Sequence, residues 1–296
     1  MHDDEVPIDE GLVRRLLAGA FPAWADLALE AVPSAGTDHA LYRLGEDKSV
    51  RLPRIDWATG QAEFEAEWAP RLAPHLPFAI PVPLGVGEPA EGYPWRWGVY
   101  PWLPGEALDR DPAHDPAQLA RDLAAFVVAL RSIDAADAPR GGRSSRVGEL
   151  LARDGDVRGD VATLGDMVDG AALLAAWEDA LRAPPWGGPA TWAHSDLLPG
   201  NLLLVDGRLS AVIDLGGMRA GDPAVDAMPG WTTLPRDVRW IYREALGVDD
   251  ATWDRGRGWA IVFAVAALPY YRETNPTLAN IAARTIDAVL RERAAG

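Results

Sequence analysis

The fold of this chain follows from two motifs, HSDLLPGN at residues 194–201 and IDLGG at residues 213–217. Two short apolar runs lie between them, and the dipeptide Asp206-Gly207 separates the runs. Asp-Gly between two apolar runs is a strong signal for a β-hairpin. Because both ends of a tight hairpin lie together, we expect the polar side chains before and after it to converge.

Three oxygen-bearing side chains flank the predicted hairpin, namely Asp196, Asn201 and Asp214. Mg²⁺ prefers one or two carboxylates together with substrate phosphates. The remaining carboxylate could accept a proton from a hydroxyl nucleophile, and Gly216 would let the backbone turn sharply beneath the metal. The alternative is that these residues only form turns and caps, which Asp and Asn favour.

The rest of the chain predicts a sheet followed by helices. Apolar periodicity predicts a helix over 10–17, then short strands between 29 and 53, and a helix over 61–72 with Phe64, Trp68 and Leu72 on one face. Two more strands are expected before residue 103. Prolines and a glycine at 101–105 mark a boundary between two domains, 1–103 and 104–296. Beyond it we predict helices over 118–133, 173–181, 236–246, 252–268 and 276–292, with a surface loop or a helical insertion over 140–160.

Composition excludes several classes of protein. The 296 residues contain 44 acidic and 28 basic side chains, a net charge of −16, and no cysteine. Zinc ribbons, iron–sulfur clusters and thiol nucleophiles are therefore excluded, and an acidic chain repels nucleic acid. No apolar run approaches the roughly 20 residues that span a membrane, and the acidic N-terminus does not resemble a secretion signal. We expect a cytoplasmic protein with neither a nucleic-acid nor a membrane partner.

The series HSDLLPGN, VIDLGG and GDPAVD (residues 221–226) resembles the antibiotic phosphotransferase family, the aminoglycoside and macrolide kinases that share the protein kinase fold. The resemblance extends from about residue 29 to the C-terminus. It implies an α+β, bilobal fold, with a small antiparallel-sheet N-lobe over 1–103 that covers the nucleotide. The larger, mainly helical C-lobe over 104–296 would hold the catalytic loop, the metal site and the substrate pocket.

The resemblance also implies roles for the motif residues. Asp196 would be the catalytic base, and Asn201 and Asp214 would hold Mg²⁺ on the phosphates of ATP or GTP. His194 would brace the catalytic loop. Of the two aspartates in GDPAVD, the first, Asp222, would support that loop by hydrogen bonding, and both would have structural roles.

The N-lobe departs from the kinase pattern, which places a lysine on a strand and pairs it with a helix glutamate. Arg51 occupies the expected lysine position, and a guanidinium can bind phosphate oxygens through two parallel hydrogen bonds. Lys48, the only lysine of the chain, is the alternative, in the preceding turn. The helix partner would be Glu65, with Glu63 and Glu67 as rivals.

Two further segments would contact the nucleotide. The segment 34–39 holds the place of the nucleotide-covering loop, although it contains a single glycine and a plain hairpin loop is an equal alternative. The segment 99–103, with Tyr100 and Trp102, would be the hinge whose backbone binds the purine edge. Pro101 removes one backbone donor there, and the aromatic side chains are expected to pack rather than to touch the nucleotide.

These features predict a Mg²⁺- and nucleotide-dependent O-phosphotransferase that acts on a small-molecule hydroxyl. An aminoglycoside antibiotic is the first expected acceptor, and its cationic groups would be bound by carboxylates chosen from Asp154, Asp156, Asp160 and Glu273. A macrolide or a small metabolite is the alternative acceptor. A further alternative is a catalytically silent, kinase-shaped binding module, because Arg51 and the glycine-poor loop depart from the kinase pattern.

Overall fold

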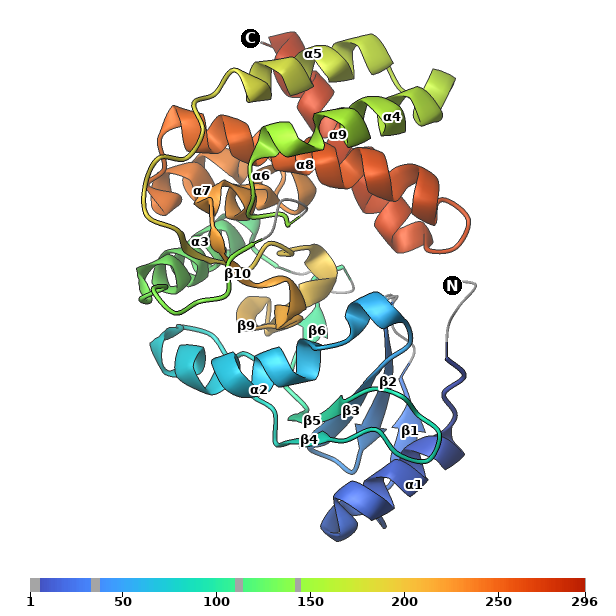
Figure 1. Cartoon of the computed structure of the whole chain (residues 1–296). Coiled ribbons are helices and arrows are strands. Elements are labelled where there is room, and N and C mark those ends of the chain that lie inside the picture. Colours follow the sequence, from blue (N-terminus) through green and yellow to red (C-terminus); the bar gives the residue numbers. More distant parts are fainter. Residues whose placement is uncertain (1–5, 33–37, 110–113, 142–144, 296) are drawn as a thin grey trace. The chain divides into compact units, whose positions relative to one another are not determined.

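The computed structural model describes residues 6–32, 38–109, 114–141 and 145–295 (Figure 1). Its contacts divide the chain into two compact units. Unit 1 comprises residues 1–105 and the returning segment 210–216, and unit 2 comprises residues 106–209 and 217–296. The sequence did not indicate the returning segment, and the functions assigned to residues 1–103 and 104–296 stay predictions.

Unit 1 is built on a five-stranded sheet in the order β1-β2-β3-β5-β4, in which every neighbouring pair is antiparallel. The predicted small antiparallel sheet is therefore confirmed. Its strands are β1 (Leu29–Ala31), β2 (His39–Leu44), β3 (Lys48–Pro53), β4 (Gly85–Gly87) and β5 (Trp97–Pro101). Arg51 of β3 pairs with Leu41 on one side and with Gly98 on the other, so it occupies the middle of the sheet.

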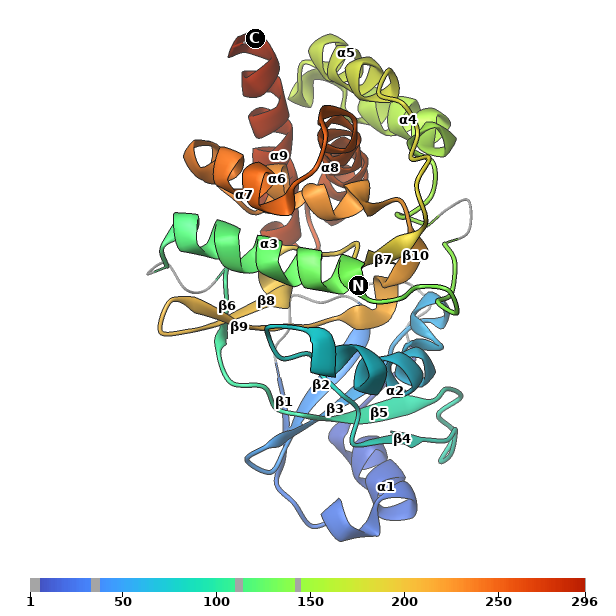
Figure 2. The same cartoon turned by 90° about the vertical axis from the view of Figure 1, so that its left-hand side faces the viewer.

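Two helices cover opposite faces of this sheet (Figure 2). Helix α1 (Glu10–Ala20) begins where the Asp9 side chain accepts the Leu12 N–H at 2.7 Å, and it packs its leucines against the sheet. Helix α2 (Gln61–Leu72) lies on the other face. Its buried residues are Ala62, Glu65, Ala69 and Leu72, whereas Phe64 and Trp68 of the predicted stripe are half-buried.

Unit 2 is mainly helical, as predicted. Helix α3 packs against α7, and α8 is the central helix, because apolar side chains are buried on nearly all its sides against α4, α5 and α9. The segment 140–160 leads into a helix, α4, rather than a plain loop. The helices are α3 (Pro116–Ser132), α4 (Asp154–Leu164), α5 (Gly170–Leu181), α6 (Pro229–Thr232), α7 (Arg239–Leu246), α8 (Asp250–Tyr271) and α9 (Pro276–Ala295).

The predicted hairpin is present and carries the chain from unit 2 into unit 1. Strands β8 (Leu202–Val205) and β9 (Arg208–Val212) are joined by Asp206 and Gly207, whose φ angles of 51° and 72° fit a tight hairpin turn. Strand β6 (Glu106–Ala107) pairs with β8. Strand β7 (Thr191–Ala193) pairs antiparallel with β10 (Arg219–Gly221), and β7 leads directly into the first motif.

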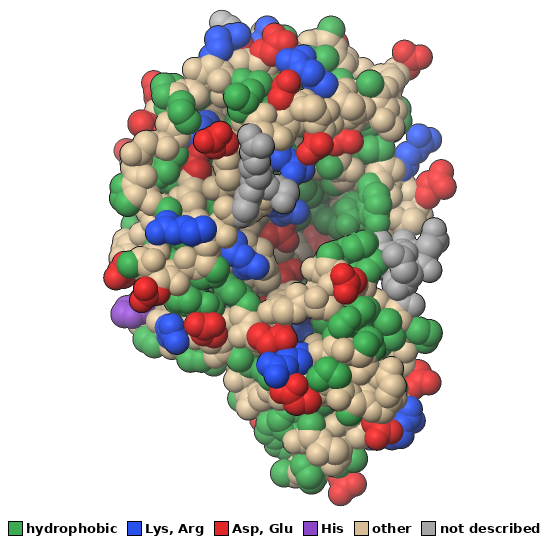
Figure 3. Space-filling model, in the orientation of Figure 1, with side chains coloured by type: hydrophobic (Ala, Val, Ile, Leu, Met, Phe, Trp, Pro, Cys, Tyr) green, Lys and Arg blue, Asp and Glu red, His purple; other side chains and the backbone are tan. Residues whose placement is uncertain are grey.

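The surface of the protein is mixed in character. On the face drawn in Figure 3, acidic and basic side chains are interspersed with apolar ones. Within the part of the chain that the structure describes, no helix combines the length and the apolar character needed to cross a membrane.

Candidate functional site

In unit 1, Arg51 joins two carboxylates that are far apart in sequence. Its guanidinium lies 3.4 Å from Glu65 Oε1 and 3.4 Å from Asp214 Oδ1. Strand β3 supplies Arg51, helix α2 supplies Glu65, and the end of the returning segment supplies Asp214. Burial lowers the pKa of Arg51, but the charges of Glu65 and Asp214 raise it well above its ordinary value, so the guanidinium stays charged.

Glu65 is the only one of the three candidate glutamates that is fully buried, with 0% of its side chain exposed. A buried carboxylate needs charged or hydrogen-bonding partners. Besides Arg51, it accepts a hydrogen bond of 2.8 Å from the Gln61 amide and one of 2.5 Å from the Tyr100 hydroxyl. Burial, together with the charge of Glu65, holds the pKa of Tyr100 well above 10. Glu63 is half-buried and lies 3.8 Å from Arg96, and Glu67 is exposed and lies 3.8 Å from Arg71.

Gln61 is a member of this cluster that sequence reasoning missed. Its Nε2 also donates to Asp214 Oδ1 at 2.9 Å, so one amide ties both carboxylates together. The signal was its spacing, because Gln61 lies four residues before Glu65 at the start of α2 and therefore on the same helix face.

The backbone around Asp214 differs from the expectation. The left-handed conformation occurs at Asp214 itself, with φ 65°, and not at Gly216. A Cβ at position 216 would lie 2.5 Å from the end of the Gln61 side chain, so a larger residue there would displace this amide. A non-glycine residue held at positive φ stores strain, which is typical of functional sites.

His39, the first residue of β2, is a titratable neighbour of this cluster. Burial and the positive charge of Arg51 lower the pKa of His39 to about 3, against a smaller opposing effect of Asp214. The imidazole is therefore neutral at neutral pH, and it adds no positive charge beside Arg51.

The remaining predicted residues of unit 1 lie elsewhere in the sheet. Lys48 is the first residue of β3 and its ammonium pairs with Asp47 at 2.7 Å, whereas Arg51 makes the ion pair with Glu65. The Trp102 N–H donates to the Asp47 carbonyl at 2.7 Å, and the Arg43 guanidinium stacks 4.6 Å from the Trp102 ring. The hinge role of Tyr100 and Trp102 stays a prediction. Residues 34–37 of the predicted nucleotide-covering loop, 34–39, lie outside the described residues.

In unit 2, the first motif is held by Asp226. The Asp226 carboxylate accepts the backbone N–H groups of His194 and Ser195, each at 2.8 Å. Ser195 has a left-handed backbone, with φ 67°, and its hydroxyl donates to the Gly217 carbonyl at 2.9 Å. These bonds fix an unfavourable conformation directly before Asp196. The buried His194 ring also accepts the Asp196 N–H at 3.3 Å.

Support of the loop was assigned from the sequence to the first aspartate of GDPAVD, Asp222, and this assignment was wrong. The second aspartate, Asp226, holds the predicted catalytic loop, while Asp222 pairs with Arg255 through bonds of 2.7 and 3.1 Å. Both partners of this ion pair are buried. Asp222 also accepts the Ala224 N–H, which starts the short helical turn that carries Asp226.

Asp196 and Asn201 are brought together within unit 2. The Asn201 amide donates to the Asp196 carbonyl at 2.8 Å and to its Oδ2 at 3.0 Å. The other carboxylate oxygen, Oδ1, accepts a hydrogen bond from Arg146, which also donates to the Ser195 carbonyl at 3.1 Å. Arg146 was not predicted, because it lies 50 residues before Asp196 in an irregular segment.

The side chains present fit a hard cation such as Mg²⁺. Because the Asn201 NH₂ group is used on the Asp196 carboxylate, its amide oxygen points away from Asp196. The Asp214 carboxylate is 40% exposed and within reach of solvent. Over the described residues there is no cluster of three or more His, Cys, Asp or Glu of metal-binding geometry. Asn201 belongs to unit 2 and Asp214 to unit 1, so their convergence stays a prediction.

Two of the four carboxylates predicted for a cationic acceptor are occupied. Asp154 accepts from the Trp177 indole at 2.8 Å and from Arg158 at 2.9 Å, and these bonds lower its pKa. Asp156 lies 3.4 Å from Arg153. Asp160 is half-buried, and burial raises its pKa. Glu273 is exposed in the turn after α8.

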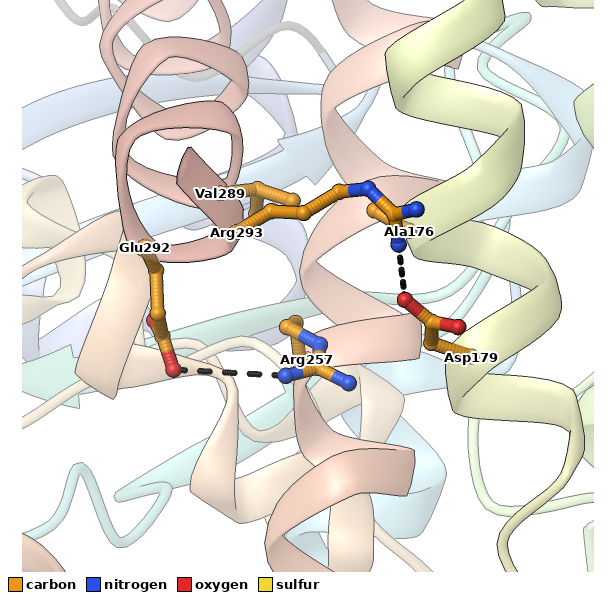
Figure 4. A pocket seen from close by; sticks show the side chains of 6 residues that line it. All are labelled: Ala176, Asp179, Arg257, Val289, Glu292 and Arg293. Atoms are coloured by element: carbon orange, nitrogen blue, oxygen red, sulfur yellow. Dashed lines mark hydrogen bonds and ion pairs between the residues drawn. The ribbon is translucent and has the colours of Figure 1, made fainter. Parts of the chain in front are cut away.

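A pocket of about 530 Å³ lies in unit 2 among α5, α8 and α9 (Figure 4). Its charged side chains pair with one another, Arg293 with Asp179 and Arg257 with Glu292 at 4.0 Å. None of the predicted site residues lines it.

Both the family model that matches this chain and several solved structures with a similar fold are of phosphotransferases. The model of the phosphotransferase enzyme family matches residues 30–259, from β1 into α8. No curated protein gives a significant match. The macrolide 2′-phosphotransferase MphH from Brachybacterium faecium is 24% identical, covers 95% of this chain and 98% of its own, and has a TM-score of 0.63.

Two other solved structures have the same fold. A macrolide 2′-phosphotransferase type I is 20% identical, with coverage of 95% and 98% and a TM-score of 0.64. APH(2″)-IIIa in complex with GDP and kanamycin is 17% identical, with coverage of 96% and 99% and a TM-score of 0.69. The α+β, kinase-like bilobal fold is thereby confirmed. Because the family model covers well over half of the chain, this protein belongs to the phosphotransferase enzyme family and is a kinase-like phosphotransferase.

Proposed function

We propose that this enzyme transfers the γ-phosphate of ATP or GTP to a hydroxyl group of a small-molecule antibiotic, with Mg²⁺ as cofactor. The main support for the proposal is the orientation of the Asp196 carboxylate. In unit 2 the Asp196 carboxylate, 25% exposed, is oriented by the Asn201 amide on a loop that the buried Asp226 holds in a left-handed conformation. This arrangement presents a carboxylate at a fixed position, which suits a general base.

Asp196 is the proposed base, which accepts the proton of the acceptor hydroxyl as the hydroxyl oxygen bonds to the γ-phosphorus. The bond from the γ-phosphorus to the bridging oxygen breaks, and the nucleoside diphosphate leaves with the electron pair. Asn201, through its amide oxygen, and Asp214, through its carboxylate, are the proposed ligands of Mg²⁺. Bound there, the cation would neutralise charge on the nucleotide phosphates. Phosphoryl transfer depends mainly on such positioning and charge neutralisation, so no covalent nucleophile is required.

Arg51 is the proposed phosphate-binding cation of unit 1. The fully buried Glu65 pairs with Arg51 and accepts hydrogen bonds from Gln61 and Tyr100, which supports an orienting role for the glutamate. A guanidinium in this position can bind two phosphate oxygens at once. The cation–glutamate pair of kinases is therefore retained with arginine in place of lysine, which favours an enzyme over a silent binding module.

The acceptor is proposed to be an aminoglycoside or a macrolide. One similar structure holds kanamycin, and two others are macrolide 2′-phosphotransferases. Of the carboxylates predicted for a polycation, Asp154 and Asp156 are already engaged by arginines. Because fewer carboxylates are left for a polycation, this observation supports keeping the macrolide as the second candidate acceptor. Asp160 and Glu273 are the remaining candidates to bind the cationic groups of an aminoglycoside.

The test is a transfer assay with γ-labelled ATP and GTP, Mg²⁺, and a panel of aminoglycosides, macrolides and small alcohol metabolites. The proposal expects label to appear on at least one antibiotic in a metal-dependent manner. Labelling of a metabolite alone would leave the chemistry in place and replace the acceptor. A protein that binds no nucleotide and labels nothing would be the silent module.

A further inference from the structure

Arg146 contacts the carboxylate oxygen that the proposed chemistry needs. Its guanidinium makes an ion pair with Asp196 Oδ1 and a hydrogen bond of 3.1 Å to the Ser195 carbonyl. The opposite oxygen, Oδ2, accepts from Asn201 at 3.0 Å. Both oxygens of the proposed base therefore already accept hydrogen bonds from side chains of the protein.

A guanidinium at this position cannot take over the role of the base. It has five donors and no acceptor, and it stays protonated in proteins. An acceptor hydroxyl must place its own O–H against a lone pair of Asp196, and the guanidinium competes for that place at Oδ1. Arg146 therefore restrains the base as long as it keeps this contact.

The geometry also allows Arg146 to leave. Its side chain is 45% exposed, and exposed ion pairs contribute little to stability. Its backbone is anchored, because the next residue, Val147, is buried and its carbonyl accepts the Asp222 N–H at 3.0 Å. A rotation of the side chain alone can thus uncover Oδ1 without any movement of the segment.

We infer that Arg146 is a positioning residue that caps Asp196 until the acceptor displaces it, and thereby suppresses the hydrolysis of nucleotide by water. This inference rests on the proposed function. In the suppressed reaction, the oxygen of water bonds to the γ-phosphorus and its proton passes to Asp196. The bond to the bridging oxygen breaks, and the nucleoside diphosphate leaves with the electron pair. Water is too small to displace the guanidinium, whereas an acceptor brings further contacts that compensate for the lost ion pair.

The experiment measures nucleotide hydrolysis without any acceptor, using the full chain with Mg²⁺ and ATP or GTP. We expect Arg146→Gln, which removes the charge and shortens the side chain, to raise the rate about tenfold over wild type, below the roughly 100-fold or more that a general base contributes. Arg146→Lys should lie near wild type, because a cation is restored. The matched control Arg236→Gln, at an exposed arginine of unit 2, should leave the rate unchanged.

The variant Asp196→Asn tests whether Arg146 acts through the Asp196 carboxylate. The double variant Arg146→Gln/Asp196→Asn should hydrolyse nucleotide as slowly as Asp196→Asn alone, because the cap acts only through that carboxylate. An Arg146→Gln rate at or below wild type, or a double variant as fast as Arg146→Gln, overturns the inference. Nucleotide binding, measured by thermal shift, distinguishes a failure of this inference from a failure of the proposed function. If the variants bind nucleotide and the rates do not respond, only the cap is wrong, and if none binds, the proposed function is wrong as well.

Discussion

The Asp226 carboxylate accepts the Ser195 backbone N–H at 2.8 Å, across 31 positions of sequence. Ser195 has a left-handed backbone that a serine adopts at a cost. The second oxygen of Asp226 accepts the neighbouring His194 N–H. One fully buried carboxylate therefore stabilises the turn that places Asp196, and burial, opposed by these bonds and by His194, raises its pKa.

Asp226→Asn should destabilise the loop that carries Asp196, the proposed base. An amide offers one acceptor oxygen in place of two, so one of the two backbone donors loses its partner and faces an NH₂ group. Leaving a buried donor unsatisfied costs about 1–3 kcal/mol. We expect a loss of that size in the free energy of urea unfolding and a lower kcat, with Asp237→Asn at an exposed position as the control. Wild-type stability and kcat would contradict this role of Asp226.

Arg255→Met should leave Asp222 as an unpaired buried charge. Removing one partner of a buried ion pair typically costs about 3–5 kcal/mol. The double variant Arg255→Met/Asp222→Asn should recover part of that loss, because it no longer buries a lone carboxylate. Denaturant unfolding of the two single variants and the double variant measures the coupling. Additive losses would show that the two side chains do not stabilise each other.

Glu65→Gln should raise the KM for nucleotide, by about tenfold if the orientation of Arg51 depends on the carboxylate charge. The amide keeps the size of the side chain but loses the ion pair of 3.4 Å and the acceptor for Gln61 or Tyr100. Glu67→Gln, on the same helix but exposed beside Arg71, is the matched control. Equal effects of the two substitutions on KM would refute the role of Glu65.

His39 should make the fold sensitive to acid. Its pKa is about 3 in the folded chain and near 6.5 when unfolded, so the unfolded state binds the proton more readily. Stability is then fully present above pH 6.5 and falls as the pH drops toward 3, by up to about 1.4 kcal/mol per unit. His39→Gln should flatten the decline of Tm between pH 6 and pH 4. Parallel Tm profiles of the two proteins would show that His39 is not the cause.

Local sequence signals predicted the helices and turns whose formation depends on neighbouring residues in the chain. The dipeptide Asp206-Gly207 defines the hairpin, and the periodic leucines of 10–17 define α1. The helix over 61–72 was predicted with the correct ends, but most of its fully buried side chains were not identified. Its buried side carries Glu65, which periodicity counts as polar and which only the distant Arg51 and Tyr100 make tolerable in the core.

The part of the candidate site that lies in short sequence motifs could be predicted. The segments 194–201 and 213–217 identified Asp196, Asn201 and Asp214 as candidates, and the pairing of Arg51 with Glu65 followed from the resemblance. Arg146 and the true role of Asp226 were missed, because each acts through a contact over 31 or more positions that no local pattern encodes. Gln61 was missed although its spacing to Glu65 is a local signal, and its contact with Asp214 spans 153 positions.

Phosphoryl transfer by Asp196→Asn tests the central claim most directly. Wild-type protein and this variant are supplied with γ-labelled nucleotide, Mg²⁺ and the acceptor that the wild-type protein labels best. The variant keeps the size of the side chain but cannot accept the hydroxyl proton. The account predicts a fall in kcat of at least about 100-fold, with nucleotide affinity within about twofold of wild type. Transfer at the wild-type rate by Asp196→Asn would contradict it.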